Sequence, residues 1–306
     1  MENMDIVCNI DNGYVKYCVV MLTSLFINNK NKRLHIHIIA DDLSEESQFI
    51  LSDVVEKQYK QHLSFYLVGA DLLSKCPIDA NNYISISTYY RCFLTTVLPS
   101  DISKVLYLDC DLIVRKPLDA LFAICLDGYA VGAVEDMWSA KESHYIRLRY
   151  PEEYSYFNAG VLLVNLDYWR RHDIEDEITE YITNYPERLL YNDQDVLNAV
   201  LYARRLFIPF RWNMQDGFFR KRRKLRPNSI PALEAEMPET AIVHFTGGKK
   251  PWHEKSVHPY KKEYFKYLDF TRWSGERPPV NYLFRFSKLF NPIQGILGWK
   301  NVYRKI

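Results

Sequence analysis

The sequence predicts an α/β protein with a mixed, mainly parallel central sheet that is flanked by helices. In the first half of the chain, short apolar runs of strand length alternate with longer segments of helical pattern. This β-α-β order is typical of folds in which crossover helices pack on parallel strands. Polar residues follow the first and fourth apolar runs, and ligands of such sheets bind outside the carboxyl ends of the strands.

The first half contains four apolar runs that we interpret as strands. They cover residues 5–10, 34–40, 63–68 and 105–108. Helical segments are predicted over residues 14–29, from an N-cap at Ser44, and over residues 88–98, where Pro99 ends the segment.

The second half has a less regular pattern. Strands are predicted at residues 129–134, 160–166 and 241–245, and helices at 173–185 and 193–203. The basic run from Arg220 to Lys224 is interpreted as a solvated loop.

Composition excludes several classes of protein. The chain has 306 residues, of which 48% are hydrophobic, so it can bury a core of ordinary size and is not intrinsically disordered. A net charge of +1 argues against a general nucleic-acid-binding protein. The 6 cysteines form no C-x-x-C pair, and Glu2 and Asp5 interrupt any basic leader. We therefore expect reduced thiols and a cytoplasmic location.

The end of the chain differs from the rest. After Glu276 there is no acidic residue, and aromatic side chains are interleaved with lysine and arginine. This change of composition predicts a main domain over residues 1–275 and a basic, aromatic, helical tail over residues 276–306. Such a tail suits an anionic membrane surface, with a C-terminal helix packed on the core as the alternative.

Two carboxylates interrupt the apolar run 105–114. Asp109 and Asp111 are two residues apart, so in an extended chain their side chains point to the same side. Two buried like charges repel each other, and a divalent cation would relieve that repulsion. The alternative is that both acids are solvated at the end of a strand.

Three further segments carry polar groups suited to chemistry. His244 leaves an apolar strand and offers an imidazole, and Gly247 and Lys250 follow it as a close-approach glycine and a cation for phosphate. Asn158 precedes a buried strand. Asp193 could cap the helix that follows it, although capping leaves Gln194 unexplained.

Taken together, these segments resemble the family 8 retaining glycosyltransferases. The matching motifs are Leu-Asp-Cys-Asp at 108–111, Phe-Asn-Ala-Gly-Val at 157–161, Asn-Asp-Gln-Asp at 192–195, and the segment from His244 through Trp252-His253. The likeness is strongest to bacterial lipooligosaccharide α-galactosyltransferases and lipopolysaccharide α-glucosyltransferases, and it covers residues 4 to 255. Thr246 departs from it, standing where the galactosyltransferases have cysteine.

The resemblance implies a GT-A fold and a role for each matching position. Asp109, Asp111 and His244 would bind a divalent metal, Mn²⁺ or alternatively Mg²⁺. The residues implied at the nucleotide and diphosphate are Asn9, Asp11, Tyr14, Asp109, Cys110, Gly247 and Lys250. Those implied around the donor sugar are Arg91, Asp136, Asn158, Asp193 and Gln194, with Gln194 beneath the anomeric carbon.

The implied reaction is transfer of galactose or glucose from a UDP-sugar to a saccharide acceptor with retention of the α configuration. The acceptor would be lipooligosaccharide or lipopolysaccharide core, or another bacterial surface glycan. The protein would be cytoplasmic and peripherally associated, through its tail, with the inner face of the plasma membrane. The alternatives are a nucleotidyltransferase on a similar scaffold, and a non-catalytic or self-glycosylating sugar-binding relative.

Overall fold

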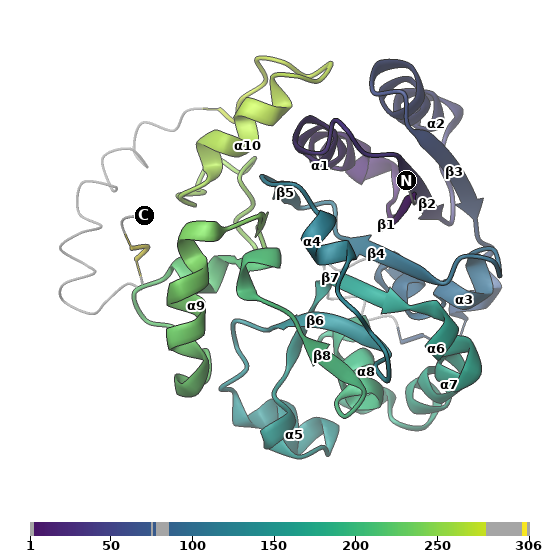
Figure 1. The fold of residues 1–306 in the computed structure, drawn as a ribbon, viewed down its shortest axis with the longest axis vertical. Helices are drawn as coiled ribbons and strands as arrows, with labels where there is room; N and C mark the ends of the chain where they lie inside the picture. The colour runs from purple at the N-terminus through teal and green to yellow at the C-terminus, as the bar shows by residue number, and fades with distance from the viewer. Residues whose placement is uncertain (1–2, 75, 78–85, 280–301, 305–306) are drawn as a thin grey trace.

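The central sheet lies at the middle of the molecule with helices on both faces (Figure 1). A computed structural model describes residues 3–74, 76–77, 86–279 and 302–304. Within these residues the sheet has the strand order β3-β2-β1-β4-β7-β6-β8. The strands are β1 (Met4–Asn9), β2 (Leu34–Ala40), β3 (His62–Leu67), β4 (Lys104–Leu108), β6 (Val131–Glu135), β7 (Phe157–Asn165) and β8 (Arg205–Phe207).

The sheet is mixed, as predicted, and its parallel part is the amino-terminal half. Strands β1 to β4 pair in parallel, and β6 pairs in parallel with β8. Strand β7 runs antiparallel to both of its neighbours, β4 and β6. The apolar runs locate the strands but do not fix their directions, so the position of the antiparallel strand was not predictable from them.

A second, three-stranded sheet corrects one expectation. It contains β5 (Leu112–Val114), β10 (Ile242–His244) and β9 (Met214–Gln215). The apolar run 105–114 is therefore not one strand, because β4 and β5 belong to different sheets. The corner between them keeps its backbone paired, since Asp109 N–H donates to the Gly160 carbonyl and Phe245 N–H to that of Asp111, both at 2.9 Å. Asp109 and Asp111 consequently lie at a corner rather than along an extended strand.

The helices occupy the predicted places with small changes in their bounds. They are α1 (Val15–Asn28), α2 (Glu45–Ser52), α3 (Leu94–Val97), α4 (Asp119–Phe122), α5 (Glu142–Leu148), α6 (Leu166–Arg171), α7 (Ile174–Asn184), α8 (Asn192–Leu201), α9 (Ile230–Glu236) and α10 (Lys261–Leu268). Ser44 caps α2 as expected, because its hydroxyl accepts from the Ser47 N–H at 3.2 Å.

The single helix expected over residues 88–98 is wrong. A 3-10 helix over Ile86–Cys92 precedes the short helix α3. The carboxylate of Glu175 accepts from the Thr96 N–H at 3.1 Å, which satisfies a first-turn amide of α3 and so starts a separate helix there.

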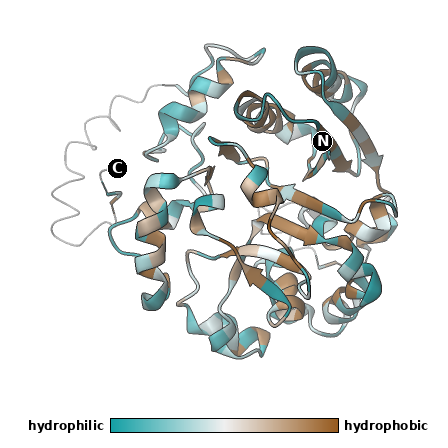
Figure 2. Ribbon diagram, in the orientation of Figure 1, coloured by the Kyte–Doolittle hydropathy of each residue, from teal (hydrophilic) through white to brown (hydrophobic). Residues whose placement is uncertain are grey.

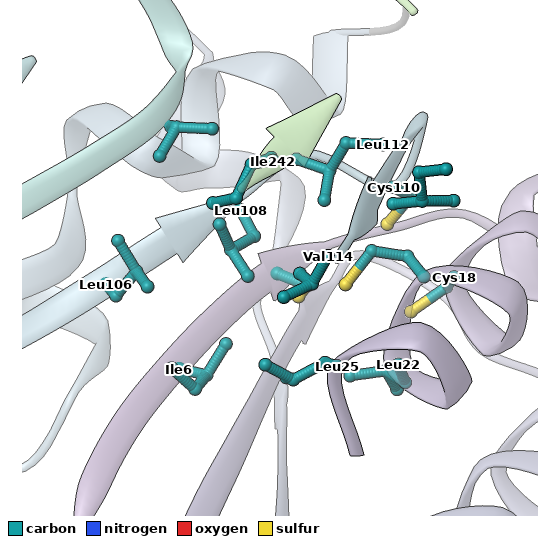
Figure 3. Packing of buried hydrophobic residues seen from close by; sticks show 14 of the residues in the cluster. Ile6, Cys18, Leu22, Leu25, Leu106, Leu108, Cys110, Leu112, Val114 and Ile242 are labelled. Carbon is teal, nitrogen blue, oxygen red and sulfur yellow. The ribbon is translucent and has the colours of Figure 1, made fainter. Parts of the chain in front are cut away.

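Hydrophobic residues are concentrated on the strands of the central sheet (Figure 2), and their buried side chains form two large clusters. Alternate residues of β1 enter different layers, since Ile6 and Cys8 belong to one cluster and Val7 to the other. In the first layer, Cys110 and Leu112 pack with Cys18 of α1 beneath the β4–β5 corner (Figure 3). The buried contacts with α1 therefore hold the β4–β5 corner in place on its core side.

Residues 302–304 pack against the segment that follows β9. Lys221 N–H donates to the Val302 carbonyl at 2.9 Å and Arg304 N–H to that of Phe219 at 2.8 Å, so residues 302–304 pair with the segment 219–221. Of the basic run expected to be solvated, Arg223 is buried, because its side chain pairs with Glu234 and is only 4% exposed.

The helical tail was predicted over residues 276–306. Its described residues, 276–279 and 302–304, are not helical, and residues 280–301 and 305–306 lie outside the described residues. Among the helices that are described, none has both the length and the apolar composition needed to cross a bilayer.

Candidate active site

A cavity of about 420 Å³ lies at the carboxyl ends of β1, β4 and the facing end of β7. Every site residue that the sequence analysis named lines this cavity: Asn9, Asp11, Tyr14, Arg91, Asp109, Cys110, Asp111, Asp136, Asn158, Asp193, Gln194, His244, Gly247 and Lys250. Residues from distant parts of the chain are thus brought to one place.

The β4–β5 corner carries three groups that could bind a metal. The Nε2 atom of His244 lies 3.1 Å from Asp111 Oδ1 and 3.6 Å from Asp109 Oδ2. One ligand atom from each of the three residues lies within 4.8 Å of the other two. Two carboxylate oxygens and one imidazole nitrogen form a set that suits Mn²⁺.

A chain of side-chain amides orients the His244 ring. Its Nδ1 lies 2.9 Å from Asn213 Oδ1, and the Asn213 amide donates in turn to Asn158 Oδ1 at 2.8 Å. Because Nδ1 is engaged by Asn213, Nε2 is the ring nitrogen that faces the two carboxylates. Metal-binding histidines are usually held in this way by a partner on the other ring nitrogen.

Gly160 leaves room for this arrangement. A Cβ atom at this position would lie 2.1 Å from His244 Cε1 and 2.6 Å from Asp109 Oδ2, both far below contact distance. Any other residue would displace the imidazole or the carboxylate. The glycine of Phe-Asn-Ala-Gly-Val therefore has a steric role at the metal corner.

Basic side chains compensate the charge of the two aspartates. Lys250 Nζ pairs with Asp111 Oδ2 and also donates to the Phe245 carbonyl at 2.8 Å. Burial opposes ionisation of Asp111, but Lys250 and His244 outweigh it and hold the pKa of this carboxyl well below its ordinary value. The Asp111 carboxylate is therefore held in the charged form that a cation would bind.

Arg91 links Asp109 to Asp193. Its Nη2 lies 2.8 Å from Asp109 Oδ1, and its Nε lies 3.1 Å from Asp193 Oδ2. The buried guanidinium also donates to the Ala159 carbonyl at 2.7 Å and stacks on the ring of Tyr107. Burial raises the pKa of Asp193 to about 6, with Arg91 opposing that rise and Asp109 adding to it.

Asn158, Asp136 and Gln194 form a second polar network. Asn158 Nδ2 donates to Gln194 Oε1 at 3.0 Å and to Asp136 Oδ2 at 3.1 Å. Gln194 Oε1 also accepts from the Ala159 N–H at 3.0 Å, which fixes the orientation of its amide. Burial raises the pKa of Asp136. The Gln194 carbonyl oxygen points to β7, and its role beneath an anomeric carbon stays a prediction.

The amino end of α8 is fixed by Asp195 rather than by Asp193. Asp195 accepts two hydrogen bonds from Arg147, at 2.6 and 2.9 Å, and one from the Tyr156 hydroxyl at 2.8 Å. The suggestion that Asp193 caps the helix is wrong, because its side chain pairs with Arg91 and the residue preceding the helix makes no side-chain cap.

The end of β1 forms another part of the cavity wall, where the nucleotide was predicted to bind. Asn9 Nδ2 donates to the Ser87 carbonyl at 3.0 Å, and Asn9 Oδ1 accepts from the Tyr107 hydroxyl. Asp11 accepts from the Tyr14 N–H at 3.1 Å, and burial raises the pKa of Tyr14 to about 12. Cys110 lines the cavity, although its thiol belongs to the core beside Cys18 (Figure 3).

Asp216 supports the loop that follows β10. Its N–H donates to the Thr246 hydroxyl at 3.2 Å, and its carboxyl group lies against Gly247. The carboxylate pairs with Arg220 at 3.0 Å and accepts from the Tyr303 hydroxyl. The end of the chain therefore contacts a side chain that touches the glycine loop of the site.

Sequence reasoning missed several residues that complete the site. Asn213 contacts His244 and Tyr107 donates to Asp109. Asn213 stands in a segment without a polar motif, whereas Tyr107 precedes the two aspartates in the 105–114 run, where it reads as one more apolar strand residue. Trp138, His144 and Tyr191 form an aromatic wall of the cavity. No spacing in the sequence links these positions. The aromatic content of 15% is the one feature of the sequence that is consistent with such a wall.

A second cavity, of about 480 Å³, is lined mostly by apolar residues, including Pro117, Ile124 and Trp212. It contains none of the site residues named above.

Comparisons with known proteins agree with this geometry. The family model described as Glycosyl transferase family 8 matches residues 5–256. The chain is 26% identical to a lipopolysaccharide 1,2-glucosyltransferase of Escherichia coli K12, over 90% of this chain and 81% of that protein. General stress protein A of Bacillus subtilis is 28% identical, over 89% of this chain and 96% of that protein.

Among solved structures, the galactosyltransferase LgtC in complex with donor and acceptor sugar analogues superimposes with a TM-score of 0.80 at 28% identity. The match covers 92% of this chain and 99% of LgtC.

Substitution of Gly160 tests the metal corner. Gly160→Ala should lower Mn²⁺ affinity by about tenfold or more, because the added methyl group must displace His244 or Asp109. Overpacking should also lower the unfolding free energy by about 1–3 kcal/mol. Isothermal titration with Mn²⁺ and urea unfolding measure the two effects. Gly69→Ala is the matched control, because its Cβ would meet nothing within 4 Å. Equal Mn²⁺ affinity in the two variants would contradict the steric role.

The raised pKa of Asp193 predicts a pH dependence of stability. Between its ordinary pKa of 3.8 and about 6, the folded state holds a proton that the unfolded state has lost, so stability falls as pH rises through this range. Asp193→Asn should remove up to about 1.4 kcal/mol per pH unit of that slope. Urea unfolding of both proteins from pH 4 to 7, with chelator present, measures the difference. Parallel pH profiles would show that Asp193 is not the titrating group.

Proposed function

The chain belongs to glycosyl transferase family 8, and from this premise we propose that it transfers a hexose from a UDP-sugar to a saccharide acceptor with retention of configuration. One observation carries the proposal. A single cavity holds a three-residue metal corner, a lysine and a glycine for a diphosphate, and a buried carboxylate–arginine–amide set of the kind that binds sugar hydroxyls.

The metal corner and the loop after β10 would hold the donor diphosphate. Mn²⁺ bound by Asp109, Asp111 and His244 would neutralise the charge that grows on UDP as it leaves. Lys250, which pairs with Asp111, would contribute a cation to the diphosphate. Gly247 would let the backbone approach the phosphates closely, and Asp216 supports that loop from behind.

Arg91, Asp193 and Asp136 would bind the hexose. The Asp193 carboxylate is held by Arg91, so its remaining lone pairs could accept from sugar hydroxyls. Asp136 is buried between the amides of Asn158 and Gln194 and lines the same cavity. Such buried groups would discriminate between sugars. A sugar that lacks the matching hydroxyl would leave a buried polar group without a hydrogen bond, which costs binding free energy.

Gln194 would lie beside the reacting centre. A neutral amide is a poor nucleophile, which favours front-face substitution within an ion pair over a covalent glycosyl-enzyme. In that route the acceptor hydroxyl attacks the anomeric carbon as the bond to UDP breaks, and its proton passes to the departing phosphate. The amide dipole would stabilise an oxocarbenium-like transition state.

The aromatic wall would hold the acceptor. Trp138 and Tyr191 lie in a T-shaped arrangement, with ring centroids 6.5 Å apart, and both line the cavity. Aromatic faces suit the C–H side of a hexose. The Escherichia coli relative is a lipopolysaccharide glucosyltransferase, and LgtC is a galactosyltransferase. We propose lipooligosaccharide or lipopolysaccharide core, or another bacterial surface glycan, as the acceptor, and UDP-galactose or UDP-glucose as the donor.

Screening UDP-hexoses for Mn²⁺-dependent hydrolysis, and then for transfer to truncated glycolipids, tests this function. Asp111→Asn should lower kcat/KM by at least about 10²-fold, because one ligand of the metal corner is lost. Gln194→Ala should lower kcat and leave UDP affinity unchanged. The exposed Asp127→Asn is the matched control. A β-linked product in the proton NMR spectrum would contradict retention.

Membrane association of residues 276–306 is a further part of the proposal. Deleting the segment would also remove the contact between Tyr303 and Asp216, so point substitutions are the cleaner test. Arg285→Gln, Lys288→Gln and Lys300→Gln together should reduce flotation with phosphatidylglycerol vesicles, by about 1 kcal/mol of binding free energy per residue. UDP-sugar hydrolysis should be unchanged. Undiminished flotation of the triple variant would contradict an electrostatic attachment.

A further inference from the structure

A second group of metal-ligating side chains lies at the opposite ends of the strands from the active site. Asp5 on β1 pairs in register with His35 on β2, and His37 follows two residues later on the same face of the sheet. One ligand atom from each residue lies within 4.8 Å of the other two. Asp5 is four residues before Asn9 along β1, which separates the group from the donor cavity by about 13 Å.

The ligand atoms have spacings that suit a metal ion. Asp5 Oδ1 lies 2.9 Å from His37 Nε2 and 3.6 Å from His35 Nδ1. Tetrahedral Zn²⁺ with bonds of 2.0–2.1 Å would place its ligand atoms roughly 3.3 Å apart, which lies between these two distances. Small rotations of the side chains would therefore admit the ion.

The other nitrogen of each imidazole already has a partner on β3. His37 Nδ1 lies 3.0 Å from the Tyr66 hydroxyl, and His35 Nε2 lies 2.8 Å from Ser64 Oγ. These hydroxyls fix both rings so that the remaining nitrogens face Asp5. The arrangement matches the outer partners that orient metal-bound histidines.

Burial and charge also favour a cation with an open coordination position. The His37 side chain is fully buried, whereas those of His35 and Asp5 are 29% and 21% exposed. Within the described residues, the ion-pairing partners of the Asp5 carboxylate are these two histidines. One side of the group is thus open to water, which could supply a fourth ligand.

We propose that Asp5, His35 and His37 form a second divalent-metal site, for an ion of the class that prefers imidazole, with Zn²⁺ as the first candidate. Bound Zn²⁺ would join β1 to β2 through side chains at the amino ends of the strands and would stabilise the sheet. The site is independent of the proposed transfer reaction. His62 on β3 pairs in register with His35 on β2, and the centroids of the two rings are 6.0 Å apart. His62 can therefore be tested as an additional ligand.

Zinc titration of the full chain without a histidine tag tests this site. The wild-type protein should bind Zn²⁺ at two places, because the Asp109–Asp111–His244 corner also accepts divalent ions. Asp111→Asn should remove one binding event, and His35→Gln should weaken the other at least tenfold. The exposed His172→Gln is the matched control and should retain both. Loss of all Zn²⁺ binding in Asp111→Asn alone would overturn the proposal, as would unchanged affinity in His35→Gln.

Two further measurements keep the result interpretable. Mn²⁺-dependent UDP binding should be unaffected in His35→Gln, which shows that the variant is folded and that the two sites are separate. Tyr66→Phe removes the hydroxyl partner of His37 and leaves all three ligands in place, so it should weaken Zn²⁺ binding severalfold. His37→Gln removes a proposed ligand and is measured alongside. If Tyr66→Phe and His37→Gln, as two single variants, both kept the wild-type Zn²⁺ affinity, the zinc would be bound by other residues.

Discussion

The structure depends on one electrostatic constraint, which is the placement of two carboxylates at the corner between two sheets. Asp109 and Asp111 are only partly exposed and lie close together, so their charges are compensated by the protein and could be compensated further by a bound cation. The basic groups that contact them come from three other segments: Arg91, His244 at the end of β10, and Lys250 in the loop after it. Asn213 and Asn158 orient His244 from a further segment each. These contacts join the seven-stranded sheet, which contains β4, to the three-stranded sheet, which contains β5 and β10.

Much of the fold was predictable from the sequence because the relevant signals are local. Strand β2 has the predicted bounds, and β1, α1 and α7 differ from prediction by a residue or two, since each shows an uninterrupted period of 2 or 3.6. Nine of the fourteen named site residues lie in four short motifs. The other five, Asn9, Asp11, Tyr14, Arg91 and Asp136, lie outside these motifs and were named from the family resemblance. Every named residue lines the cavity.

The rest was not predictable because it depends on long-range contacts. The β4–β5 corner is invisible in an apolar run, since both strands are apolar and only their different partners distinguish them. The break in the 88–98 segment depends on Glu175, far along the chain. Asn213 and Tyr303 act through single hydrogen bonds to other site residues, and no pattern around them indicates that role. The division of the chain at residue 276 gave no indication that Tyr303 would return to Asp216.

The shared guanidinium of Arg91 has a consequence for any attempt to assign energies to single residues. It pairs with Asp109, one of the three candidate metal ligands, and with Asp193 at the start of α8, and it is buried between them. If one carboxylate is removed, the whole Arg91 charge is left to pair with the other. If Arg91 is removed, Asp109 and Asp193 both lose their arginine partner. Free energies measured for substitutions at these three positions should therefore not add, and only a double-mutant cycle would recover their coupling. Arg91, Asp109 and Asp193 are better regarded as one thermodynamic unit than as three separate binding residues.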